Sequence, residues 1–215
     1  MFSFMQEKRD PGSYKGAMEN SVKILTQKDP VQIARWSGGM YRPDFSSLLL
    51  SSLGQLLQVE LPQGEVYFKG TQQKPLWQWR LITTNYLGRA HGTPLAGNLI
   101  SFRELEGGGT FLPAFQKSAI ARLVKIAEEN SIADINNACL QLGGELGSRG
   151  DAGALLHFYP RFPVTVVFWK GDEEIVSSAN LLFDETANHY LHTEDIAVVG
   201  ELVAYFLERL CRGDS

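Results

Sequence analysis

The last third of the chain combines short apolar runs with one long amphipathic stretch, and this combination restricts the fold more than any other feature. Residues 155–159 and 164–169 have the composition of neighbouring strands, and the second run is apolar on both faces, as a central strand is. A hairpin turn at 170–173 leads to another apolar run at 181–183. A helical period follows, with apolar residues three or four positions apart: Ile196, Val199, Val203, Phe206 and Leu210. We therefore expect an α+β fold with a mainly antiparallel sheet, packed helices and a C-terminal amphipathic helix.

The rest of the chain alternates between helix and strand signals, with glycine and proline at the turns. The glycines at 107–109 predict a loop, and the five glycines between 143 and 153 predict a mobile connection or a lid. Further strands are predicted at residues 45–51, 55–61, 64–69 and 98–105. Helices are predicted at 13–36 with a break at Asp29 and Pro30, at 75–87, at 113–130 from Pro113, at 132–142, and from a cap at Thr193 or Asp195 to about residue 210.

A single hydrophobic core is the simplest organisation for a chain of this length. With 215 residues and 44% hydrophobic side chains, it can bury enough apolar surface to fold as one domain over residues 1–215. The alternative is two subdomains, 1–110 and 111–215, divided near Gly107. Limited proteolysis distinguishes these two organisations, because stable halves require an accessible segment between them.

Charge and hydropathy exclude two classes of partner. The 20 basic and 24 acidic side chains give a net charge of −4, so no global basic field is present to collect nucleic acid. No apolar run of this sequence approaches the roughly 18 residues that a membrane-spanning helix needs. The segment 1–10 has no apolar core of signal-peptide length. We expect a cytoplasmic protein that binds neither nucleic acid nor a membrane.

The cysteine content agrees with a reducing compartment. Two thiols are too few for a disulfide scaffold, and too few for a Cys-rich zinc or iron–sulfur site. Cys139 lies in a helix-like stretch and is expected to be a small buried side chain. Cys211, near the C-terminal end, is expected to be exposed.

An acidic segment at 172–195 differs from the rest of the chain. It contains seven carboxylates and no lysine or arginine: Asp172, Glu173, Glu174, Asp184, Glu185, Glu194 and Asp195. Carboxylates are favourable in the first turn of a helix, which accounts for Glu194 and Asp195 without any function. This structural interpretation is favoured. The alternatives are a divalent-cation site and a docking surface for a basic partner, formed by the acidic tip of the predicted hairpin.

Two histidines fall inside the acidic segment. Histidines three residues apart converge on one cation if their backbone is helical, but His189 and His192 precede the start of the last helix. With Asp184 or Glu194 completing the ligands, and Asp172 or Glu173 as general base, they would form the site of a metal-dependent enzyme such as a hydrolase. Because the backbone is expected to be irregular here, the favoured interpretation is that these two histidines bind no metal.

No catalytic signature strengthens the enzyme hypothesis. The glycines at 107–109 lack the lysine and hydroxyl residue of a phosphate-binding loop, and no serine lies in a Gly-x-Ser-x-Gly turn. The aromatic residues around Trp169 are expected to form core, the alternative being the wall of a flat cofactor pocket. No catalytic residue, metal or cofactor is therefore assigned, and a binding role is favoured over an enzyme.

Several short motifs resemble an uncharacterised domain family of anaerobic bacteria and archaea. The segments 86–97 and 101–105 are similar to its central part, and the likeness spans most of residues 15–210. The more specific motifs are Trp-Lys-Gly-Asp-Glu-Glu at 169–174, Leu-Phe-Asp at 182–184, His-Tyr-Leu at 189–191 and Glu-Asp at 194–195. Members of that family can be joined to, or encoded near, iron–sulfur and corrinoid proteins. Because this chain has no cysteine cluster, the resemblance implies that any cluster belongs to a partner protein.

These observations favour a ligand- or partner-binding accessory protein over a metal-dependent enzyme. The resemblance implies that its role is in anaerobic metal-cofactor metabolism, with an iron–sulfur or corrinoid protein as partner. The candidate binding residues lie in or beside the acidic segment: Trp169, Asp172, Glu173, Asp184, His189, His192 and Glu194.

Overall fold

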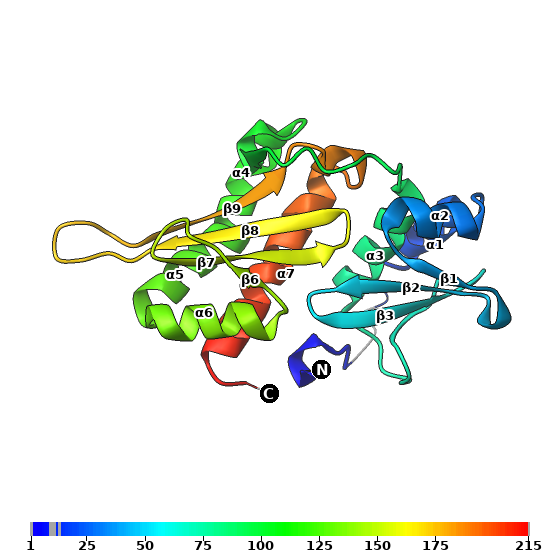
Figure 1. The fold of residues 1–215 in the computed structure, drawn as a ribbon, viewed down its shortest axis with the longest axis horizontal. Helices are drawn as coiled ribbons and strands as arrows, with labels where there is room; N and C mark the ends of the chain where they lie inside the picture. Colours follow the sequence, from blue (N-terminus) through cyan, green and yellow to red (C-terminus); the bar gives the residue numbers. More distant parts are fainter. Residues whose placement is uncertain (1, 9–11, 13, 215) are drawn as a thin grey trace.

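Two antiparallel sheets lie side by side in the computed structural model of this chain, with helices packed against them (Figure 1). This arrangement confirms the α+β class. The structure describes residues 2–8, 12 and 14–214. Residue 13, the predicted start of the first helix, and both ends of the 1–215 domain prediction lie outside the described residues.

The five-stranded sheet has the order β5-β9-β8-β7-β6. Its middle strand, β8, is buried on both faces along nearly all of its length, as its apolar sequence predicts. The strands β8 and β9 form a hairpin whose last pair is Trp169 with Ser178. The strands are β5 (Leu99–Ser101), β6 (Glu145–Leu146), β7 (Ala152–Tyr159), β8 (Phe162–Trp169) and β9 (Ser178–Asp184).

The four-stranded sheet is a meander in sequence order. Three of its strands were predicted to within a few residues, but the short strand β1 was missed because three residues show no alternation. The predicted strand at 45–51 begins later, since Phe45 lies in a 3-10 turn, Pro43–Phe45. The strands are β1 (Met40–Arg42), β2 (Ser47–Ser52), β3 (Gln55–Glu60) and β4 (Val66–Phe68).

The first two helices, α1 (Lys15–Leu25) and α2 (Pro30–Ser37), are separated where the sequence predicts a break. Asp29 caps α2, because its carboxylate accepts a hydrogen bond from the Val31 N–H at 3.1 Å. Proline is tolerated at the first helical position, where its missing N–H has no partner to lose. The break therefore follows from the Asp-Pro pair.

Helix α3 (Trp77–Arg89) is buried on most of its surface. The side chains of Trp79, Ile82 and Tyr86, spaced three and four positions apart, are buried, and so are polar side chains on its other faces. This happens because α1, α2 and the C-terminal helix α7 (Thr193–Cys211) all pack against α3. The buried hydroxyls of α3, such as that of Thr83, bond to carbonyl oxygens of the helix itself.

The C-terminal helix α7 confirms the predicted amphipathic helix. Its cap was predicted wrongly: His192 occupies the N-cap position, while Thr193 and Asp195 lie in the first turn. Their side chains bond elsewhere, since the Thr193 hydroxyl donates to the Glu106 carbonyl and the Asp195 carboxylate accepts from the Asn85 amide. The buried stripe of α7 is Ile196, Val199, Val203, Phe206 and Leu210.

Residues 108–129 form one continuous helix, with α4 (Gly108–Phe115) and α5 (Ala121–Glu129) joined by a π-helical turn, Gln116–Ile120. The sequence placed its start at Pro113 and a loop at 107–109, and both predictions were wrong. The helix begins five residues before Pro113. Proline inside a helix interrupts the backbone hydrogen bonding, and π-turns absorb such irregularities.

Gly108 shows why this helix starts early. It is buried, and a Cβ on it would lie 2.2 Å from the Phe102 carbonyl oxygen, so only glycine allows this close approach. The same contact explains why the predicted strand at 98–105 is shortened to β5. A 3-10 turn, Phe102–Glu104, capped by Ser101, follows it directly.

The glycine-rich segment 143–153 is less free than predicted. Two of its residues form the edge strand β6, which pairs with β7, beside helix α6 (Ile132–Gln141).

On α6, Cys139 is buried as expected, and burial raises the pKa of its thiol to about 12. Cys211 was predicted to be exposed, but it packs against the hydrophobic core at the end of α7.

Stacked tyrosines pack helix α3 against strand β7 and the segment before α7. Tyr86 stacks between Tyr159 and Tyr190, with ring centroids 4.3 and 5.6 Å apart. Its hydroxyl donates to the Ser37 carbonyl at 2.7 Å and accepts from the Arg161 N–H at 3.1 Å. The aromatic residues around Trp169 are core, as predicted, but Trp169 itself is 43% exposed. In the described part of the chain, no helix is long and apolar enough to cross a membrane.

Candidate functional site

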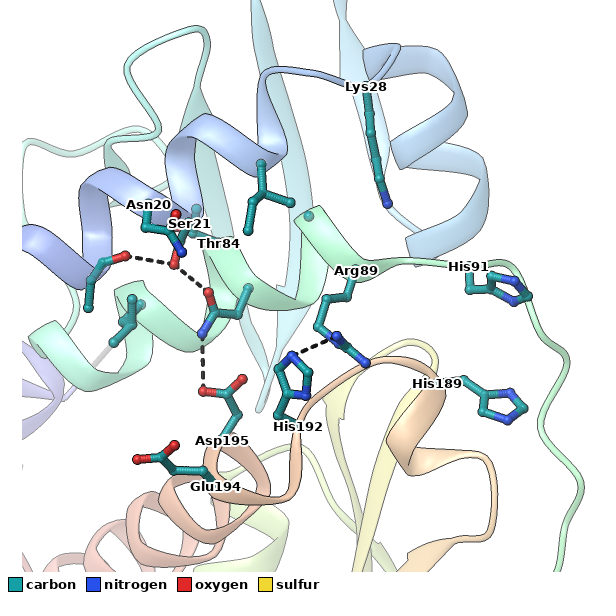
Figure 2. A pocket seen from close by; sticks show the side chains of 15 residues that line it. Asn20, Ser21, Lys28, Thr84, Arg89, His91, His189, His192, Glu194 and Asp195 are labelled. Atoms are coloured by element: carbon teal, nitrogen blue, oxygen red, sulfur yellow. Dashed lines mark hydrogen bonds between the residues drawn. The ribbon is translucent and has the colours of Figure 1, made fainter. Parts of the chain in front are cut away.

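A cleft of about 920 Å³ opens between α1, α3 and the start of α7 (Figure 2). Its walls come from three stretches of the sequence, 17–28, 81–91 and 189–195, which meet because α3 packs against both α1 and α7. Basic side chains lie toward one end of the cleft and two carboxylates toward the other (Figure 2). Three apolar side chains also line the cleft: Ala17, Ile24 and Leu81.

Two cations face this cleft without a carboxylate partner. No carboxylate of the described residues forms an ion pair with Lys28 or Arg89. Arg89 donates to His192 Nε2 at 2.7 Å and to the Asn188 carbonyl at 3.3 Å. Partial burial, together with repulsion from Arg89, lowers the pKa of Lys28. Positive charge is thus held close together at one end of the cleft.

Two further histidines lie at the same end, His91 after α3 and His189 before α7. The Nδ1 atoms of both contact the Thr93 hydroxyl, at 2.9 and 3.1 Å. Gly92 makes this loop possible: its φ is +78°, and a Cβ on it would lie 2.4 Å from Trp36. The contacts with Thr93 leave the Nε2 atoms of these histidines available to a ligand.

The opposite end of the cleft is acidic. The half-buried Asp195 accepts a hydrogen bond from Asn85 Nδ2 at 3.1 Å, and Asn85 Oδ1 accepts from the Ser21 hydroxyl. This chain of bonds fixes the orientation of the Asn85 amide. Burial raises the pKa of Asp195, opposed by the hydrogen bond from Asn85 and the nearby His192. Glu194 lies beside it and is exposed.

Three of the predicted binding residues line this cleft: His189, His192 and Glu194. Asp184 does not, because its buried carboxylate accepts hydrogen bonds from Thr186 and from the backbone of residues 96–97. Within the part of the chain that the structure describes, no group of three or more His, Cys, Asp or Glu side chains could hold a metal ion.

The other three predicted residues lie on the β8–β9 hairpin, far from the cleft. Trp169 ends β8, and Asp172 and Glu173 lie in the loop 170–177, which projects beyond the helices (Figure 1). Ile175 and Val176 in this loop are 67% and 84% exposed. The loop thus carries an exposed apolar pair beside its carboxylates.

The loop 170–177 has a defined shape. Asp172 Oδ1 accepts from the N–H groups of Glu174 and Ile175, both at 2.9 Å, and these bonds lower the pKa of Asp172. Lys170 turns away from the tip, since its ammonium donates to the carbonyls of Ala127 and Asn130 at the end of α5. Only negative charge therefore remains at the tip.

Sequence reasoning missed the basic residues of the cleft. Lys28 follows α1 and Arg89 is the last residue of α3. They are 61 positions apart, and neither is in a motif that predicts their proximity. His91 was not predicted as a site residue, and Asp195 was interpreted as part of a helix start. The one available signal was the pair His189 and His192, which does mark one wall of the cleft.

Comparison with family models identifies the family of this chain. A family model described as "Domain of unknown function (DUF3786)" matches residues 29–206. The chain belongs to the DUF3786 family. This confirms the expected membership of an uncharacterised family. The DUF3786 match includes Arg89 and the cleft histidines but starts one residue after Lys28, so the α1 wall of the cleft precedes it. No curated protein and no solved structure matches the chain.

Proposed function

We propose that this DUF3786 domain is a binding protein whose cleft holds a small organic molecule through an anionic group. The observation that carries the proposal is the pair Lys28 and Arg89, two cations without a carboxylate partner among the described residues. Like charges held together are unfavourable unless an anion accompanies them. Phosphate and carboxylate groups suit such a site, because guanidinium and ammonium groups form charge-assisted hydrogen bonds with both.

The remaining walls favour an organic ligand over a simple ion. Ile24 is 43% exposed and lies in the cleft beside Ala17 and Leu81. The volume of about 920 Å³ falls in the range typical of sites for small molecules. The apolar side chains would cover the body of the ligand, while Lys28 and Arg89 would fix its charged end.

Calorimetric titration of the full chain with inorganic phosphate tests this proposal. Lys28→Ala removes one charge-assisted contact and is expected to weaken phosphate binding by about tenfold. Lys23→Ala is the matched control, because Lys23 lies on α1, the helix that directly precedes Lys28, is exposed and does not line the cleft. Failure of the native chain to bind phosphate would overturn the proposal, as would equal affinities for the native chain and Lys28→Ala.

We place this binding role in anaerobic metal-cofactor metabolism, as the family resemblance implies, with an iron–sulfur or corrinoid protein as partner. The exposed loop 170–177 is the proposed contact, because apolar Ile175 and Val176 stand beside carboxylates that would attract a basic partner surface. Titration with a purified corrinoid protein and a purified iron–sulfur protein tests this. Glu173→Gln should slow association with one of them, and no binding to either would refute the partner assignment.

A further inference from the structure

The two carboxylates of the cleft restrict which charges its ligand can carry. Asp195 and Glu194 form no ion pair with any basic side chain of the described residues. They lie at the end of the cleft opposite His91 and His189 (Figure 2). A ligand with only anionic groups would leave these two carboxylates unpaired inside the same cleft.

From this arrangement we propose that the ligand is a small zwitterion, with its anionic group at Lys28 and Arg89 and a cationic amine at Asp195 and Glu194. This rests on the proposed function, since it assumes an anion at the basic end. Both charges of the cleft would then be neutralised by one molecule. The cleft would reject uncharged ligands and simple polyanions, because each leaves charges of the protein unpaired.

Asp195 is suited to bind the amine. One of its oxygens accepts from Asn85, and Asn85 is held in turn by Ser21, so the carboxylate has a fixed position before any ligand arrives. Its other oxygen has no hydrogen bond among the described residues and is free to accept from an ammonium group. The half-buried setting strengthens this interaction relative to one at an open surface.

Glu194 supplies a second, more adaptable carboxylate. It is exposed and has no hydrogen bond from its side chain among the residues that the structure describes. It is next to Asp195 in the first turn of α7, so a positive group between them would be attracted by both. Two carboxylates match the several hydrogens that an ammonium group donates.

The test compares phosphate esters that differ only in the amine. Ethyl phosphate, 2-aminoethyl phosphate and 3-aminopropyl phosphate are titrated into the full chain by calorimetry. At least one amine should bind fivefold or more tightly than ethyl phosphate. Asp195→Asn should reduce this preference to less than twofold. Lys28→Ala should weaken binding of all three esters by the same factor.

Two further variants keep the result interpretable. Glu194→Gln should reduce the preference for the amine even if Asp195→Asn proves unstable. The control is Glu201→Gln, on the exposed face of α7 outside the cleft, which should leave the preference for the amine unchanged. Equal binding of ethyl phosphate and both amines by the native chain would overturn the zwitterion proposal alone. Absence of binding by all three esters would overturn the anion-binding proposal as well.

Discussion

Asp184, at the end of β9, has a buried carboxylate that holds a loop leading to the cleft. Oδ1 accepts from the Thr186 hydroxyl at 2.6 Å, the Thr186 N–H at 3.0 Å and the Ala96 N–H at 3.1 Å, and Oδ2 accepts from the Gly97 N–H at 2.7 Å. These bonds anchor the irregular segment that carries Thr93, the residue between two cleft histidines. Asp184 therefore acts on the site by positioning.

Asp184→Asn is expected to destabilise the protein by about 1–3 kcal/mol, because an amide NH₂ would face backbone donors in a buried site. Urea unfolding at pH 7 measures this loss. Glu185→Gln is the control, since Glu185 is the exposed neighbour in sequence. A loss no larger than that of the control would show that these hydrogen bonds contribute little.

The same carboxylate makes stability depend on pH. Burial raises the pKa of Asp184, but the hydrogen bonds from Thr186, Ala96 and Gly97 outweigh burial and lower it overall. A lowered pKa in the folded state means that the stabilisation is fully present above the unfolded pKa of about 3.9 and is lost as the pH falls through the folded value. The difference in unfolding free energy between the native chain and Asp184→Asn should shrink below about pH 4. A constant difference between pH 7 and pH 3 would contradict this.

Among the elements, the β8–β9 hairpin combines a rigid strand pair with a shaped tip. Gly171 is required where the loop closes, because a Cβ there would lie 2.4 Å from the Ile175 carbonyl oxygen and 2.5 Å from the Ser177 nitrogen. The Gly171 N–H donates to the Ser177 hydroxyl at 2.9 Å, and the Asp172 N–H donates to the Ile175 carbonyl at 2.9 Å. The tip is thus ordered by its own bonds.

Asp172→Ala is expected to loosen this tip without affecting the rest of the fold. It removes the acceptor for two backbone N–H groups, so hydrogen exchange at Glu174 and Ile175 should become faster. The melting temperature should change by no more than about 2 °C, since the residue is exposed. Glu173→Ala, which removes no such acceptor, should leave both exchange rates unchanged. A large fall in melting temperature would mean that the loop supports the core.

The sequence predicts elements well where local chemistry decides them. The Asp29-Pro30 break, the apolar strand β8 and the stripe of α7 all follow from residues close together in the chain. The start of α4 does not, because it depends on Gly108 touching the Phe102 carbonyl in the folded protein. The cleft is harder still, since Lys28, Arg89 and Asp195 meet only through the packing of three helices.

At the scale of the whole molecule, hydrogen bonds and side-chain contacts connect the two sheets. The Leu53 N–H donates to the His157 carbonyl at 2.9 Å, and the Ser52 hydroxyl donates to the Phe158 carbonyl at 2.6 Å while accepting from Trp79 Nε1 at 3.0 Å. The strand β5, from the first half of the sequence, belongs to the five-stranded sheet. A division at residue 110 would therefore cut across a sheet.

Phe206 of α7 lies at the centre of this packing. Its ring centroid is 5.2 Å from that of Trp79 on α3 and 6.1 Å from that of Phe4. All three side chains are buried, and they come from the two ends and the middle of the chain. If the protein unfolds as one unit, weakening this contact must destabilise both halves equally.

Two probes on opposite halves test that expectation. Tryptophan fluorescence reports mainly on Trp36, Trp77 and Trp79, and in a Cys211→Ser background the only thiol is the buried Cys139. Unfolding in urea should expose the thiol to a disulfide reagent at the same midpoint at which fluorescence changes.

Phe206→Ala, expected to reduce the free energy of unfolding by about 3–5 kcal/mol, should lower both midpoints together. Glu201→Ala, on the exposed face of α7, should move neither. Separate midpoints, or stable fragments divided near Gly107 on limited proteolysis, would show instead that residues 1–110 and 111–215 fold independently.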